Sequence, residues 1–133
     1  MKLATKERYA LSAMLELAAC YQQTIYRQAA QIANQHDIPI SYLEQILLKL
    51  KHKELIISTR GPCGGYRLSR PPSEINIYDI LRSPVDPYTI LDCLHAPDAC
   101  NRSAGCPTRP FWQKLNCKMT GVLKSTTLAD LMS

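Results

Sequence analysis

Residues 27–68 read RQAAQIANQHDIPISYLEQILLKLKHKELIISTRGPCGGYRL, and this stretch decides the fold. Its first half predicts two helices, over about residues 28–35 and from residue 41 onward, on either side of Asp37-Ile38-Pro39. The residue before a proline is pushed away from helical angles, so the first helix ends here and the connection is only a few residues long. A connection this short is typical of a helix-turn-helix.

The second of these helices has a marked start and two different sides. Ser41 and Glu44 have the spacing of a capping box, in which each side chain bonds the backbone amide of the other residue. An apolar stripe at helical spacing is formed by Leu43, Ile46, Leu47 and Leu50. The other side holds Ser41, Gln45, Lys49 and His52, together with Leu48, which a purely solvated face does not predict.

Two short strands follow, over about residues 56–60 and 66–69. The turn between them reads GPCGG and is rich in residues that tolerate tight backbone angles. Three arginines flank this turn: Arg60, Arg67 and Arg70. Helix, helix and hairpin in this order predict a winged helix-turn-helix, a mostly α fold with a small β-hairpin wing.

The segments around this stretch predict further helices. One covers residues 5–21, and a short one covers residues 75–81 with Asn76 as its cap. The last long helix covers about residues 111–124, where apolar residues step by three and four: Trp112, Leu115, Met119 and Val122. This seam can pack on its own subunit, but a small chain leaves little core for its last helix, so we expect it to pair with a second copy.

The positive charge is concentrated in one half of the chain. Residues 1–70 carry ten Lys/Arg against five Asp/Glu, whereas residues 71–133 carry six of each, so the net charge of +5 lies entirely in the first half. A basic block favours a polyanion, because neutralising phosphates releases counterions. An ordinary basic surface of a soluble protein would carry the same charge.

The helix that begins near residue 41 is the third helix in chain order. Its exposed polar face suits the major groove of double-stranded DNA, where side chains distinguish base pairs. Its N-terminal end is placed for base edges and Lys49 for a phosphate, while Arg60 in the wing suits a narrow minor groove. Glu44 either caps the helix or accepts from a cytosine amino group, and these uses compete for one carboxylate. The candidate DNA contacts are Arg27, Ser41, Tyr42, Glu44, Gln45, Lys49, Arg60 and Tyr66.

With 133 residues and a hydrophobic share of 46%, the chain suits one domain with an appended helix. The expected parts are a winged helix-turn-helix DNA-binding domain (1–72), a connecting helix and turn (73–92), a cysteine-rich loop (93–110) and a dimerisation helix with a C-terminal turn (111–133). No leader-like apolar segment and no apolar run of about 18 residues occurs, so we expect a cytoplasmic protein without a membrane partner.

Three of the six cysteines lie in one loop, at Cys93, Cys100 and Cys106. In a reducing compartment such clusters are more often metal ligands or redox sensors than disulfides, and three thiolates suit zinc or an iron–sulfur cluster. Three reduced thiols without a metal are the alternative. Candidates for a fourth ligand are Asp92, His95 and Asp98 in the same loop and Glu7 from a partner subunit.

No catalytic pattern is present, because the chain has no phosphate-cradling glycine loop, no Ser/His/Asp arrangement and no carboxylates paired for acid–base work. We therefore do not expect an enzyme.

The strings MKLATKERYALSAMLELA and ISYLEQILLKLKHKELIISTRGPCGGYRL, followed by a three-cysteine loop and a Trp-bearing helix, resemble the IscR/NsrR/CymR type of bacterial transcription regulators. The resemblance covers nearly the whole chain. It implies a homodimer in which the C-terminal helix crosses to the partner, and in many members a [2Fe–2S] or [4Fe–4S] cluster. It further implies major-groove roles for Ser41, Tyr42, Glu44 and Gln45, a wing role for Arg60, and cluster binding by the three loop cysteines.

This chain departs from the IscR pattern at three places. Arg109 stands where that branch has a histidine, the spacing from Cys93 to Cys100 is one residue longer, and Cys63 replaces a wing glycine. We expect a dimeric DNA-binding transcriptional regulator that senses iron–sulfur or redox status through a cluster, with [2Fe–2S] expected. The alternatives are a cluster-free regulator controlled by thiol oxidation or a protein partner, and a zinc-stabilised interaction module.

Overall fold

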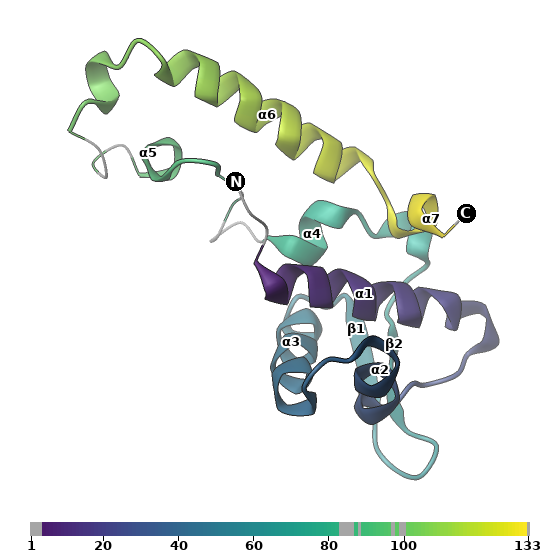
Figure 1. Cartoon of the computed structure of the whole chain (residues 1–133). Helices are drawn as coiled ribbons and strands as arrows, with labels where there is room; N and C mark the ends of the chain where they lie inside the picture. Colours follow the sequence, from purple (N-terminus) through teal and green to yellow (C-terminus); the bar gives the residue numbers. More distant parts are fainter. Residues whose placement is uncertain (1–3, 83–86, 88, 97, 99–100, 133) are drawn as a thin grey trace.

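The computed structural model describes residues 4–82, 87, 89–96, 98 and 101–132. The mostly helical class with one β-hairpin is confirmed (Figure 1). The α-helices are α1 (Thr5–Ala19), α2 (Ala29–His36), α3 (Ile40–His52), α4 (Ile77–Leu81), α5 (Asp92–His95), α6 (Arg109–Ser125) and α7 (Leu128–Leu131). Short 3₁₀ turns lie at Tyr21–Gln23, Pro72–Glu74 and Ser103–Gly105.

Helix α1 is the centre of the fold. It contacts α2, α3 and strand β2 (Gly65–Leu68) on one side, and α4 and α7 on the other (Figure 1). Small and flexible apolar residues on α1 allow this close approach, and Ala13, Met14 and Leu17 are completely or almost completely buried. The core therefore joins the helix-turn-helix to elements from the C-terminal half of the chain.

The connection between α2 and α3 is as short as expected. Asp37 adopts a left-handed conformation with φ of 53° and ends α2, and Ile38 is buried in the core. The expected capping box at Ser41 was wrong, because α3 begins one residue earlier with Pro39 at the N-cap and no side-chain cap. The buried Ile38 and the fixed φ of Pro39 set the chain into the helix at Ile40, so Ser41 lies within the first turn.

The hairpin pairs β1 (Ile56–Thr59) with β2 in antiparallel register, from Ile56 opposite Leu68 to Thr59 opposite Gly65. Ile56 and Leu68 are buried and fix the base of the wing to the core. The backbones of Arg27 and Tyr66 exchange two hydrogen bonds of 2.8 Å, which tie the wing to the segment before α2. A side chain at Gly65 would collide with the Arg27 carbonyl, so this close approach requires glycine.

The end of the chain returns to the core. Thr127 caps α7, and Leu128 is completely buried. The Leu128 amide donates to the Ile75 carbonyl at 2.9 Å, and the Ile77 amide donates to the Thr126 carbonyl at 2.9 Å. The end of α6 is thereby held to the segment that leads into α4.

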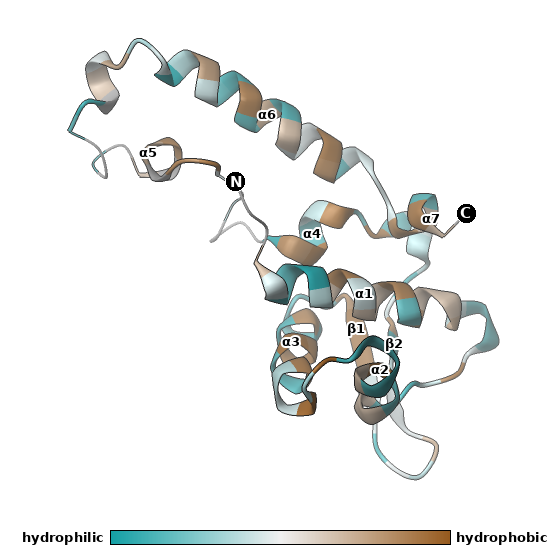
Figure 2. Ribbon diagram, in the orientation of Figure 1, coloured by the Kyte–Doolittle hydropathy of each residue, from teal (hydrophilic) through white to brown (hydrophobic). Residues whose placement is uncertain are grey.

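Helix α6 lies on the opposite side of α1 from α3 (Figure 1). None of its 17 residues, all of which the structure describes, is buried in the single chain. Phe111 is 59% exposed and Val122 is 64% exposed, and Figure 2 shows apolar residues along much of the helix. In the described residues, no helix is both long and apolar enough to span a bilayer.

Candidate nucleic-acid interface and cysteine loop

Helix α3 presents two contrasting faces. Leu43, Ile46, Leu47 and Leu50 are buried against the core, as the apolar periodicity predicted. Ser41, Glu44, Gln45 and Lys49 are exposed on the remaining surface. The buried stripe fixes the rotation of α3 about its axis, and this rotation places the four polar side chains on the outside together.

The N-terminal end of α3 is anchored by an aromatic contact. The half-buried Tyr42 ring packs edge-on against Tyr9 of α1, with 5.7 Å between the ring centroids. Glu44 takes part in no cap, and its exposed carboxylate makes no hydrogen bond or ion pair to the described part of the chain. The predicted competition between capping and base contact is therefore absent, and the Glu44 carboxylate faces solvent.

The wing tip is exposed from Arg60 to Cys63. The side-chain amide of Gln28, the residue before α2, donates to the Pro62 carbonyl of this tip at 3.4 Å. Arg60 follows the end of β1, where the turn holds its backbone beside Gly64. This arrangement presents an arginine guanidinium on a narrow projection beside α2, as a minor-groove contact would need.

The two remaining candidate contacts are held more tightly. The Arg27 guanidinium forms an ion pair of 2.9 Å with Glu16 of α1 and a hydrogen bond of 3.2 Å with Gln35. Tyr66 is half-buried against the core. A phosphate contact by Arg27 would compete with the Glu16 carboxylate. In this structure Arg27 joins α1, α2 and the wing through its side-chain and backbone bonds.

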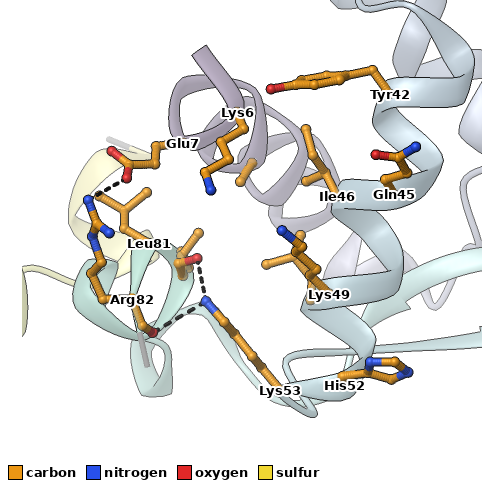
Figure 3. A pocket seen from close by; sticks show the side chains of 13 residues that line it. Lys6, Glu7, Tyr42, Gln45, Ile46, Lys49, His52, Lys53, Leu81 and Arg82 are labelled. Atoms are coloured by element: carbon orange, nitrogen blue, oxygen red, sulfur yellow. Dashed lines mark hydrogen bonds and ion pairs between the residues drawn. The ribbon is translucent and has the colours of Figure 1, made fainter. Parts of the chain in front are cut away.

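A groove of about 370 Å³ separates α3 from the start of α1 and the end of α4 (Figure 3). The amino groups of Lys6 and Lys49 point into it. The Lys53 amino group donates to the carbonyls of Asp79, Ile80 and Arg82 at 3.3, 3.1 and 3.3 Å. These carbonyls end α4, and a lysine is favourable there because it neutralises the negative end of the helix dipole.

A second clamp joins α4 to α1. Glu7 is only 5% exposed and accepts an ion pair of 2.6 Å from Arg82, the residue that follows α4. As a ligand for a partner's metal, Glu7 would have to leave this ion pair or share its second oxygen. Together Lys53 and Arg82 connect the end of α4 with both α3 and α1, so a displacement of α4 would strain its contacts with both helices.

The described part of the cysteine loop converges on the first turn of α6. The Cys106 sulfur lies 3.2 Å from the Thr108 hydroxyl, and the hydrogen bond from this side chain lowers the pKa of the Cys106 thiol. The Arg109 guanidinium donates to the Cys93 carbonyl at 3.2 Å. Arg109 therefore joins the two half-buried cysteine segments, and a guanidinium offers no metal ligand.

Cys100 lies outside the described residues, as does the side chain of His95, and Asp98 is exposed. No group of three or more His, Cys, Asp or Glu residues within the described ranges is arranged to hold a metal. Thiol donors near a polar, cationic helix start fit an iron–sulfur cluster chemically, because thiolates are its usual ligands.

A family model described as Rrf2, iron-dependent transcriptional regulator, matches residues 3–133. The chain belongs to the Rrf2 family. This Rrf2 chain is 37% identical over 132 residues to a putative HTH-type transcriptional regulator of Neisseria meningitidis, covering 99% of this chain and 88% of the relative. It is 36% identical over 132 residues to the HTH-type transcriptional regulator IscR of Aliivibrio salmonicida, covering 99% of this chain and 77% of IscR.

The solved structure of CymR, the global cysteine regulator of B. subtilis, has a TM-score of 0.77 and 32% identity, covering 99% of this chain and 96% of CymR. The resemblance to IscR- and CymR-type regulators is therefore confirmed, and this Rrf2 chain is a transcriptional regulator, not an enzyme. The alternative of a zinc-stabilised interaction module with no DNA role does not agree with membership of a family of transcriptional regulators.

Sequence reasoning missed the groups that connect the Rrf2 elements to one another. Lys53 has no local sequence pattern that assigns it a partner, yet its amino group donates to the Ile80 carbonyl at the end of α4. Glu7 and Arg82 lie far apart in the sequence, at either end of the winged helix, so no local sequence pattern indicates that they pair. Of these residues, Arg109 is the one whose partner could have been suspected from the sequence. A cation in the first turn of a helix is unfavourable with the helix dipole, so it needs another partner.

Proposed function

We propose that this regulator binds operator DNA as a homodimer, with α3 in the major groove and the wing on the adjacent backbone or minor groove. The observation that carries the proposal is the outer face of α3, where exposed polar side chains lie opposite a buried apolar stripe. Ser41, Tyr42, Glu44 and Gln45 are the proposed base contacts, and Lys49 the phosphate contact. Arg60 and the neighbouring residues Arg27 and Tyr66 complete the proposed interface.

The homodimer is supported by α6. A 17-residue helix that buries none of its residues in one chain leaves an apolar surface, including Phe111 and Val122, without a covering element. Pairing two α6 helices around a two-fold axis would cover this surface. Operator half-sites would then lie about 34 Å apart, one turn of DNA, if the recognition helices have the usual spacing.

The proposed signal is an iron–sulfur cluster on Cys93, Cys100 and Cys106, with [2Fe–2S] preferred and the fourth ligand among His95, Asp98 and the partner's Glu7. When bound, such a cluster supplies a redox-sensitive charge at the loop. Support comes from the iron-dependent family description, the likeness to IscR, and the convergence of the Cys93 and Cys106 segments on Arg109.

The chain's own residues then connect the loop with the DNA-binding face. Arg109 and Thr108 join the cysteine segments to the start of α6, and α4 lies between α6 and α1. Lys53 and Arg82 hold the end of α4 against α3 and α1. A change in the loop would shift the population of α4 and α6 positions, and so the orientation of the two recognition helices.

A second candidate keeps the DNA-binding dimer but uses thiol oxidation or a protein partner as its control. The structural likeness to CymR, a global cysteine regulator, favours it.

Anaerobic purification separates the two candidates. Visible absorption, with iron and acid-labile sulfide at the stoichiometry of [2Fe–2S], supports the cluster. A colourless protein with neither iron nor zinc supports the second candidate. Light scattering measures the dimer, and selection of bound sequences from a random duplex library measures sequence-specific DNA binding; failure to enrich any sequence would overturn the proposed function.

A further inference from the structure

Leu48 is an exposed leucine within the recognition helix. Leu48 is 53% exposed, whereas four other apolar residues of α3 are buried: Leu43, Ile46, Leu47 and Leu50. It is also absent from the partly buried residues that pack against the core. The fold therefore gives this side chain no packing role.

The position of Leu48 on α3 is central to the proposed DNA-reading face. At 100° per residue, Leu48 falls about 20° from Ser41 and about 60° from Gln45, on the side opposite the buried stripe. It also lies away from the α6 surface proposed for the dimer, because α6 lies across α1 from α3 (Figure 1). Leu48 is thus an exposed apolar side chain among polar side chains that suit base edges.

We propose that Leu48 is a specificity-determining residue that contacts the 5-methyl group of a thymine in the major groove. This inference rests on the proposed function. Leucine has no hydrogen-bonding group, so it cannot recognise the donors and acceptors of the other base edges. The thymine methyl is the apolar feature that the major groove presents, and an aliphatic side chain against it removes apolar surface of both from water.

The geometry also places the thymine within the operator. Leu48 and Ser41 are seven residues apart, which at 1.5 Å per residue is about 10 Å along the helix axis. DNA rises about 3.4 Å per base pair, so the thymine lies about three base pairs from the base that Ser41 contacts if the helix follows the groove.

The test uses the full-length dimer and an operator selected by the wild-type protein from a random duplex library. Each thymine of this operator is replaced in turn by deoxyuridine, which removes only the methyl group. Affinity at fixed salt is measured for wild type, Leu48→Ala and Leu131→Ala. Leu131 is a matched control, since it is 43% exposed on α7, and alanine retains helix propensity at both positions.

We expect one thymine in each half-site at which deoxyuridine lowers wild-type affinity about fourfold, the factor for roughly 0.8 kcal/mol of one buried methyl-sized group. Leu48→Ala should bind thymine and deoxyuridine duplexes equally, whereas Leu131→Ala should discriminate like wild type. Equal discrimination by wild type and Leu48→Ala at every thymine would overturn the assignment of Leu48 and leave the proposed function standing. A library in which no sequence is enriched would overturn both.

Discussion

Replacing Leu128 by alanine tests whether the C-terminal turn belongs to the core of the winged helix. Leu128 is completely buried, and its amide donates a hydrogen bond to the carbonyl of Ile75, which is also completely buried. Truncation of a fully buried leucine loses its transfer free energy and leaves a cavity, together worth about 2–5 kcal/mol. Because α7 is a four-residue helix that can shift into part of the cavity, we expect a loss of about 3 kcal/mol in the free energy of unfolding.

The matched control lies in the same helix. Leu131 is 43% exposed, so Leu131→Ala should change the free energy of unfolding by less than about 0.5 kcal/mol. Urea unfolding followed by far-UV circular dichroism measures both variants, at one protein concentration because dimer formation adds to apparent stability. Equal losses for the two variants, or a loss below about 1 kcal/mol for Leu128→Ala, would show that α7 does not complete the core.

The other predictions concern the interface, the dimer and the loop. Arg60→Ala should weaken operator binding about tenfold and lower the salt dependence. Lys114→Ala should leave both unchanged, because it removes a charge from the side of α6 away from the apolar seam and from the proposed DNA contacts; gel shifts across a salt series decide this. Val122→Glu should yield monomers in light scattering, because it places a charge on the exposed apolar seam of α6; a dimer of unchanged affinity would contradict that interface. Cys106→Ala should abolish the visible absorption of anaerobic protein, whereas Cys63→Ala in the exposed wing keeps it; a full spectrum from Cys106→Ala would refute the ligand set.

The periodic parts of the fold were predictable because their causes are local. The stripe of α3 was predicted correctly, and each strand end lies within one residue of its expected position. The cap of α4 was also correct, since Asn76 accepts from the Asp79 amide at 2.8 Å, within four residues of chain. The capping box of α3 was wrong because burial of Ile38 next to Pro39 moved the helix start, and sequence spacing does not report burial.

By itself, the sequence determined the order of helices and strands, the outward polar face of α3, the location of the excess positive charge and the family. Tertiary structure alone decided that Glu44 is free of a cap, that Lys53 ends α4, that Glu7 pairs with Arg82, and that Arg109 joins the two cysteine segments. The physical reason is the range of the interactions. Periodicity and capping act within one or two helical turns, whereas an ion pair or a bond to a distant carbonyl exists only after packing has brought remote residues together.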